Sequence, residues 1–190
     1  MTKKRSSKTP NDPPEKDPDA PRVSVDVNIK SREIAKRLPA IGYVTWLCSQ
    51  SQSHRQLFVQ DMEWRLFPPV ILGQYKLRIQ GKAGGLPTAY ASWAFLSEEL
   101  ENDFRATHKL RPGDWRSGDR PWLVDCIAPF GGAIDFLEEL QLDVLADQEV
   151  QLFYPGANGS AAETTLVELI KHRSKPGAST QRNSAHSPRH

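Results

Sequence analysis

The clearest pattern of hydrophobic and polar positions lies in the middle of the chain. Residues 74–80 (QYKLRIQ) alternate apolar and polar side chains, which is typical of a strand with one buried face. A glycine-containing turn at 81–85 separates them from a second strand-like run at 86–95 (LPTAYASWAF), so the pattern predicts an antiparallel hairpin. Two more strands are predicted at 122–127 (WLVDCI) and 150–154 (VQLFY).

Helical patterns surround these strands. The predicted helices are 31–38, 41–50, 98–106, 133–146 and 161–171. Pro39 is expected to end the first of them, and Ser97 to cap the third. The segment 56–66 is ambiguous, although its apolar spacing suits a helix, which Pro68-Pro69 would end.

The order of these elements decides the fold class. Residues 122–154 are consistent with a strand–helix–strand (βαβ) unit, whereas the hairpin at 74–95 is antiparallel. We therefore predict an α+β (α/β-like) single domain with a central, mostly antiparallel sheet flanked by helices. In such sheets a ligand sits beyond the carboxyl ends of the strands and near helix N-termini, which here points to 130–132.

Composition changes this picture at the two ends. Residues 1–22 are rich in Lys, Pro, Ser and Asp and contain no aromatic residue, and residues 174–190 have a similar composition. Such segments cannot bury enough apolar surface to offset the entropy of ordering the chain. We expect both ends to be disordered and a single domain to occupy 23–173.

The formal net charge of +2 is unevenly distributed. Residues 1–22 carry six Lys/Arg and four Asp/Glu, and residues 171–190 carry five Lys/Arg and no acid. The 14 basic and 19 acidic groups between these segments give the middle of the chain a net charge of −5. A domain that binds nucleic acid would carry its basic groups on the folded surface, so we expect no nucleic-acid partner.

Cysteine usage and hydrophobicity exclude further classes. Cys48 and Cys126 lie in apolar surroundings and form neither a disulfide framework nor a zinc-binding spacing. The sequence shows no signal peptide and no run of about 18 apolar residues. We expect no bound metal, no membrane span and a cytoplasmic location.

Asp125 is the strongest candidate for a functional side chain. It is the only acid embedded in an apolar strand, and a buried carboxylate is costly unless it is paired or hydrogen-bonded. The turn that follows contains Phe130, Gly131 and Gly132 and leads directly into a predicted helix. Its backbone N–H groups could hold a polar or anionic group.

His54 is the best-placed partner for Asp125. It is the only one of five histidines that directly follows an apolar segment able to fix its position. If the two meet, the carboxylate orients the imidazole and stabilises its cation, so His54 can act as a base or a nucleophile. Two simpler interpretations stay open: His54 is a surface or capping residue, or Asp125 is a structural carboxylate paired with Arg116 or Arg120.

Four blocks of sequence carry a resemblance. They are 42–47 (GYVTWL) leading to Ser51 and His54-Arg55; 74–77 (QYKL); 89–97 (AYASWAFLS); and 114–131, which contains SGDR, Trp122, Asp125 and IAPFG. In order and interval, from about 41 to 132, the chain resembles the RTX toxin-activating lysine acyltransferases of the hemolysin-activating type. The Ser-Gly-Asp-Arg-x-Trp block followed by Ile-Ala-Pro-Phe-Gly is its most specific part.

The resemblance implies a fold and a reaction. It implies a GNAT-like acyltransferase fold that moves a fatty acyl group from acyl carrier protein to internal lysines of an RTX protoxin in the bacterial cytoplasm. The essential histidine of the family falls on His54, its essential aspartate on Asp125, and a serine that precedes the histidine on Ser51. No bound cofactor is implied, because acyl-acyl carrier protein is the donor substrate, and the resemblance also suggests a homodimer.

The mechanism has two forms at this stage. In one, His54 is a general base that deprotonates the attacking lysine, and in the other it is acylated first. A lysine with an ordinary pKa of about 10.4 is mostly protonated at neutral pH, so it needs a base or desolvation. Backbone N–H groups of residues 130–132 are expected to hold the thioester oxyanion or the pantetheine arm. Arg116 and Arg120 are expected to support the strand or to contact the carrier protein.

One departure and two alternatives accompany the resemblance. Cys126 follows the aspartate where the family is expected to have an aromatic residue, and it should lie on the strand face opposite Asp125. One alternative is a non-catalytic, chaperone-like partner of a protoxin or of a carrier protein. The other is a CoA-dependent N-acetyltransferase, which would carry a Gln/Arg-x-x-Gly-x-Gly/Ala loop where this chain has 128–132 (APFGG).

Overall fold

The computed structural model describes residues 25–81, 84–155 and 161–173. The chain divides into two units, Met1–Ala35 and Lys36–His190. Of the first unit, only the beginning of helix α1 (Val25–Gln50) is described. The two ends that were predicted to be disordered, 1–22 and 174–190, lie outside the described residues. In the described part of the chain, no helix has both the length and the apolar character to cross a bilayer.

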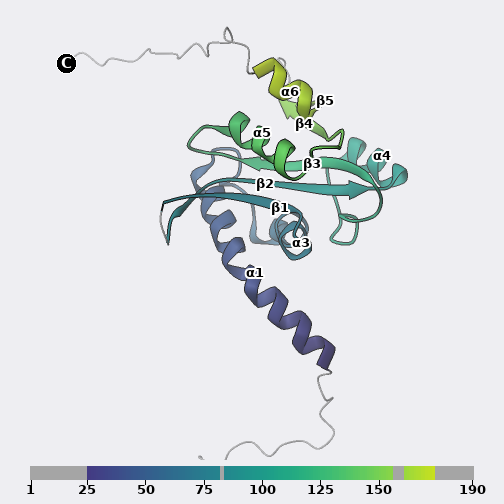
Figure 1. The fold of residues 1–190 in the computed structure, drawn as a ribbon. Helices are drawn as coiled ribbons and strands as arrows, with labels where there is room; N and C mark the ends of the chain where they lie inside the picture. The colour runs from purple at the N-terminus through teal and green to yellow at the C-terminus, as the bar shows by residue number, and fades with distance from the viewer. Residues whose placement is uncertain (1–24, 82–83, 156–160, 174–190) are drawn as a thin grey trace, which may run out of the picture. The chain divides into compact units, whose positions relative to one another are not determined.

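A five-stranded sheet forms the centre of the second unit (Figure 1). Its strands follow chain order: β1 (Tyr75–Gln80), β2 (Leu86–Leu96), β3 (Arg120–Ile127), β4 (Gln151–Pro155) and β5 (Ala161–Thr165). Neighbouring strands pair antiparallel, except for β3 and β4, which pair in parallel. The predicted hairpin is β1–β2. The mostly antiparallel sheet agrees with the predicted fold class and is consistent with a GNAT-like domain.

Helices cover both faces of the sheet (Figure 1). Helices α5 (Ala133–Asp143) and α6 (Leu166–Arg173) share one apolar core with β2, β3 and β4. On the other face, α1 and the residues that follow it pack against Tyr90 and Ile127. Helix α4 (Glu98–Thr107) extends that second face through a core that contains two fully buried tryptophans. The β3–α5–β4 connection is the βαβ unit that the sequence predicted.

The segment between α1 and β1 contains short helical turns. A 3₁₀ turn (Val59–Asp61) leads into α2 (Met62–Arg65) and then into α3 (Phe67–Leu72). Pro68 and Pro69 were expected to end a helix, but they lie in the first turn of α3. Proline is tolerated there because the first N–H groups of a helix have no intrahelical partner to lose.

The prediction that Pro39 ends a helix is wrong, because α1 continues through it. Proline removes one N–H from the helical ladder, and packing beyond it outweighs that loss. Ala40, Val44, Leu47 and Cys48 are all buried at helical spacing. These contacts hold the second half of α1 against the sheet and thereby fix the position at which the helix ends.

The helix predicted at 161–171 begins only at Leu166. Residues 161–165 instead form β5, in register with β4 from Gln151↔Thr165 to Pro155↔Ala161. The unpaired backbone at the edge of β4 supplies hydrogen-bond partners for this segment. The sequence Ala-Ala-Glu-Thr-Thr alone does not predict this pairing, because strand preference depends strongly on context.

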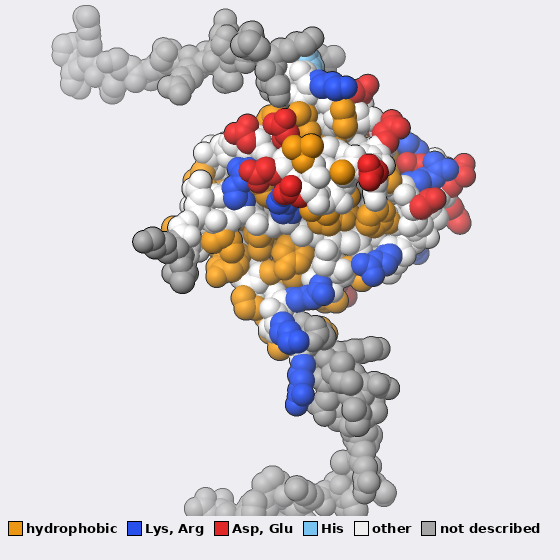
Figure 2. Space-filling view, viewed as in Figure 1, with side chains coloured by type: hydrophobic (Ala, Val, Ile, Leu, Met, Phe, Trp, Pro, Cys, Tyr) orange, Lys and Arg blue, Asp and Glu red, His pale blue; other side chains and the backbone are white. Residues whose placement is uncertain are grey.

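Side chains of different kinds gather on different parts of the surface. Figure 2 shows apolar side chains over β1 and α1, and acidic side chains over α5. Tyr43 and Ile79 are exposed apolar residues of the first region. Exposed apolar patches of this kind are typical of surfaces that contact proteins.

Candidate active site

A β-bulge determines which way Asp125 points. Along the β2–β3 pair, Ser92 lies opposite Asp125 but Trp93 lies opposite Leu123, so Val124 is an extra residue in β3. Leu123 and Cys126 pack into the α5 core, and strict alternation from Leu123 would send Asp125 there as well. The extra residue instead turns Asp125 to the face covered by α1. Cys126 lies on the opposite face, as predicted.

The turn after α1 places His54 against this carboxylate. The backbone N–H groups of His54 and Arg55 both bond to the carbonyl of Ser51, at 3.2 and 2.9 Å, and so close a tight turn. His54 Nε2 lies 2.9 Å from Asp125 Oδ1, although the residues are 71 positions apart in the chain. Only 8% of His54 and 6% of Asp125 are exposed. The structure therefore brings the two predicted residues together in a buried pair.

The other ring nitrogen of His54 faces two hydroxyl groups. Nδ1 lies 2.8 Å from Ser51 Oγ and 2.9 Å from Ser53 Oγ, and the two oxygens are 3.1 Å apart. A carboxylate only accepts hydrogen bonds, so we assign the ring proton to Nε2 and the lone pair to Nδ1. One hydroxyl then donates to Nδ1. Ser51 was predicted at this site; Ser53 was missed, although the serine-rich loop was a signal for it.

Arg65 is a further member of the site that the sequence did not reveal. Its Nε donates to Asp125 Oδ2 at 2.7 Å, so the two carboxylate oxygens serve two different partners. The expectation that an arginine would pair with a buried Asp125 was of the right kind but named the wrong residues. Arg65 lies 60 positions away, in the segment whose pattern was ambiguous, and no motif marks it.

Charge and burial act in opposite directions on Asp125. Burial is the largest influence and raises the pKa of this carboxyl, but the hydrogen bond from His54 and the charge of Arg65 outweigh it. The pKa of Asp125 is therefore lowered below its ordinary value, and the group is a carboxylate at neutral pH.

The two nearby thiols behave differently. Burial, reinforced by Asp125, raises the pKa of Cys48 to about 11 and that of Cys126 to about 12. Both cysteines are free. A thiol with such a pKa is protonated at neutral pH and is a poor nucleophile. His54 is therefore the stronger candidate for chemistry at this site.

A cavity of about 610 Å³ opens beside the pair. Strands β3 and β4 are in register only at Trp122↔Gln151 and Leu123↔Leu152, and the cavity occupies the region beyond these positions. Its polar end contains Ser53, His54, Arg65 and Asp125. The remaining lining is mostly apolar and comes from β3, α5, β4 and α6.

The glycine turn at the start of α5 lies next to this cavity. Gly131 and Gly132 have φ values of 92° and 70°, which favour glycine, and Gly132 is the N-cap of α5. The residues that follow, Ala133 and Ile134, line the cavity. Phe130 is 58% exposed and contacts Trp46, with ring centroids 5.8 Å apart. The predicted binding role of this turn stays a prediction.

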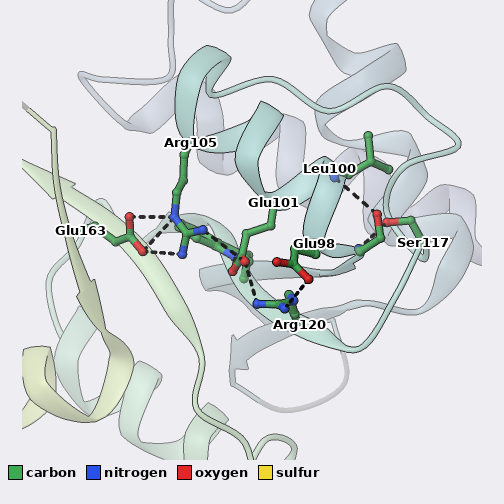
Figure 3. Close-up of polar contacts among 9 residues, drawn as sticks. Glu98, Leu100, Glu101, Arg105, Ser117, Arg120 and Glu163 are labelled. Atoms are coloured by element: carbon green, nitrogen blue, oxygen red, sulfur yellow. Dashed lines mark hydrogen bonds and ion pairs between the residues drawn. The ribbon is translucent and has the colours of Figure 1, made fainter.

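Arg116 and Arg120 make contacts elsewhere. Arg116 donates to Gln74 Oε1 at 3.3 Å and to the carbonyl of Leu72 at 3.0 Å. Arg120 forms ion pairs with Glu98 and Glu101 of α4, and Figure 3 shows this network. The alternative that Asp125 is paired with either arginine is therefore wrong. Both side chains hold neighbouring elements to the sheet.

Within the described ranges, no cluster of three or more His, Cys, Asp or Glu side chains could hold a metal ion. The groups that the site offers are an imidazole, a carboxylate, a guanidinium and two hydroxyls next to an apolar cavity. Such a set can move a proton and stabilise a charge beside an apolar substrate.

Comparison with known proteins gives a consistent result. The profile of the RTX toxin acyltransferase family matches residues 33–166. The chain is similar to the protein-lysine myristoyltransferase HlyC of Escherichia coli, with 36% identity over 150 residues, which cover 73% of this chain and 80% of that protein. It is also similar to the leukotoxin-activating lysine-acyltransferase of Mannheimia haemolytica serotype A1, with 37% identity over 92 residues, 48% of this chain.

A third relative is the protein-lysine myristoyltransferase RtxC of Kingella kingae, 36% identical over 92 residues, which cover 48% of this chain and 53% of that protein. The match also covers 53% of the Mannheimia protein, so the chain spans about half the length of several curated relatives. The family profile, in contrast, covers the whole sheet and the whole site. The chain belongs to the RTX toxin acyltransferase family.

Proposed function

We propose that this protein is a protein-lysine fatty acyltransferase, which moves an acyl group from acyl carrier protein to internal lysines of an RTX protoxin. The observation that carries the proposal is the buried His54–Asp125 pair at the polar end of an apolar cavity. The names of the relatives, which describe lysine acyltransferases and myristoyltransferases, support the same reaction class. The reaction would take place in the cytoplasm and need no bound cofactor.

His54 acts as the general base in this proposal. Its Nε2 is bonded to Asp125, so Nδ1 is the nitrogen that accepts the proton of the attacking amine. Nδ1 adjoins the ring carbon that bears the side chain, and two hydroxyls stand in front of it. A hindered nitrogen of this kind is better suited to accept a proton than to carry an acyl group. Asp125 orients the ring and stabilises the imidazolium that forms.

The acyl chain occupies the cavity. The volume of about 610 Å³ lies within the usual range for small-molecule sites, roughly 300–1,000 Å³. Leu123, Leu137 and Leu152 are among its apolar lining residues. Each methylene group that leaves water for such a lining contributes about 0.8 kcal/mol, so a long chain binds more tightly than an acetyl group.

The remaining predicted residues support the donor and the scaffold. The N-terminal turn of α5, which follows Phe130, Gly131 and Gly132, borders the cavity and has backbone N–H groups suited to the pantetheine arm. Arg116 and Arg120 keep the loop before β3 and the strand itself in place. The homodimer suggested by the resemblance stays a proposal.

The test is acyl transfer in a purified system. The protein is incubated with acyl-acyl carrier protein and a protoxin fragment, and the intact mass of the fragment is followed. The expected result is an acyl-sized increment with the wild-type protein and its loss with His54→Ala. His172→Ala, which changes an exposed histidine of α6, is the matched control and should leave transfer unchanged.

The same experiment separates the alternatives. A chaperone-like binding protein would bind the fragment or the carrier and give no increment with any donor. A CoA-dependent N-acetyltransferase would accept acetyl-CoA and leave acyl-acyl carrier protein unused. Either result would contradict the proposal.

A further inference from the structure

Arg65 is held in a defined position next to His54. On one side, the carbonyl of its neighbour Trp64 accepts a hydrogen bond from Trp115 Nε1 at 3.1 Å. On the other side, Leu66 is 1% exposed and packs in the core below α1. Its own Nε is bonded to Asp125, while its side chain remains 26% exposed and lines the cavity. The guanidinium is therefore anchored at one edge and accessible from the cavity.

The charge of Arg65 changes the charge balance of the site. Its guanidinium offsets the negative charge of Asp125, with which it pairs. With His54 protonated, the side chains of His54, Asp125 and Arg65 together carry one net positive charge. His54 and Asp125 alone would carry none. A site that carries a net positive charge at this stage matches a substrate group that has become negative.

Arg65 is also the positively charged donor at the cavity. It is the only Lys or Arg among the described residues that line it. The N–H of Gly131 already donates to the carbonyl of Ala128 at 3.2 Å. The thiol of Cys126 is a weak donor. In the described part of the chain, neither Nη atom of Arg65 donates a hydrogen bond to another group of the protein.

We propose that Arg65 is a catalytic residue whose guanidinium donates hydrogen bonds to the thioester carbonyl oxygen as it becomes an oxyanion. The inference rests on the proposed acyltransferase function. The lysine nitrogen attacks the carbonyl carbon, its proton passes to His54 Nδ1, and the electron pair of the C=O bond moves to the oxygen that Arg65 faces. When that pair returns, the C–S bond breaks and the carrier thiolate takes the proton from His54. The products are the amide and the free thiol.

Steady-state acyl transfer with Arg65 variants tests the proposal. Arg65→Ala should lower kcat about 100- to 1,000-fold and change the KM for acyl-acyl carrier protein by less than about threefold, because the lost contact forms mainly in the transition state. Added guanidinium, below the concentration that unfolds the protein, should restore part of the rate. Arg65→Lys keeps the charge without the planar fork and should retain an intermediate rate.

Arg111→Ala is the matched control, because it removes an exposed arginine that also pairs with an aspartate, at 3.1 Å. It should leave kcat unchanged. The proposal is overturned if folded Arg65→Ala keeps the wild-type kcat, or if guanidinium restores no activity and Arg65→Lys is as slow as Arg65→Ala. Should the alanine variant not fold, Arg65→Lys and Arg65→Gln give the same comparison. Failure of the wild-type protein to transfer any acyl group would refute the proposed function instead.

Discussion

Replacement of Asp125 by asparagine is the most informative perturbation of the site. The carboxylate accepts from His54 Nε2 at 2.9 Å and from Arg65 Nε at 2.7 Å, and asparagine has nearly the same shape. Its amide has only one oxygen, so it can accept from one of these donors and must present its NH₂ group to the other. The charged arginine is the stronger donor and should take the oxygen.

The NH₂ group would then face His54 and force the other tautomer of the ring. Nε2 becomes the acceptor, and Nδ1 carries the proton and donates to Ser51 or Ser53. The basic lone pair at Nδ1 is lost although every side chain remains in place. In serine proteases, the corresponding substitution lowers kcat about 10⁴-fold for this reason. We expect a loss of about 10³- to 10⁴-fold here, which corresponds to about 4–5 kcal/mol in the barrier.

The cost in folding stability should be smaller. Asp125→Asn keeps one hydrogen bond to each partner but removes the negative charge that Arg65 faces, and hydrogen bonds to a charged group are worth about 1.5–3 kcal/mol. Because Arg65 is partly exposed, water compensates part of this loss. Thermal unfolding measures the free energy of unfolding, and single-turnover transfer measures the rate. ¹⁵N chemical shifts of His54 report the tautomer directly. A folded Asp125→Asn protein that keeps Nε2 protonated, or transfers within tenfold of the wild-type rate, would refute the reasoning.

Three further predictions follow from the same contacts. Ser51→Ala and Ser53→Ala should each slow transfer by less than about tenfold, because either hydroxyl can donate to His54 Nδ1. The double variant should lose more activity than the product of the two single effects, and kcat of the three variants checks this. The lowered pKa of Asp125 stabilises the fold above the ordinary aspartate pKa of about 3.9, and this stability is lost as pH falls through the lower folded pKa. Melting temperatures below about pH 4 should therefore fall more steeply for the wild type than for Asp125→Asn. Leu137→Trp should fill part of the cavity and shift donor preference toward shorter acyl chains, whereas an unchanged preference in a chain-length series would place the acyl group elsewhere.

Much of the sheet could be predicted because its signals are local. Alternation identified β1, the hairpin geometry identified β2, and the N-cap Ser97 marked the start of α4, where its Oγ accepts from Leu100 N at 3.3 Å. The predictions that failed depended on distant partners. β5 forms only because the edge of β4 is available, and α1 continues through Pro39 because later residues of the helix are buried against the sheet.

In the candidate site, too, the residues with local signals could be predicted and those that depend on distant partners could not. Asp125 could be singled out because it is an acid within an apolar strand, and His54 because it directly follows an apolar segment. The structure places the two side chains 2.9 Å apart. The bulge at Val124, which turns Asp125 toward His54, has no signature in the run WLVDCI. Arg65 could not be found either, because its role depends on the packing of short helical turns whose pattern was ambiguous.

Acyl transfer to lysine, mapped residue by residue on the acceptor, tests the central claim most directly. Wild-type protein and His54→Gln are mixed with acyl-acyl carrier protein and a protoxin fragment for a single turnover, and the fragment is sequenced by tandem mass spectrometry. The account predicts an acyl group in amide linkage on internal lysine side chains with the wild type, and a rate lower by at least about 10²-fold with His54→Gln. Equal lysine acylation by the two proteins, or none by the wild type, would contradict it.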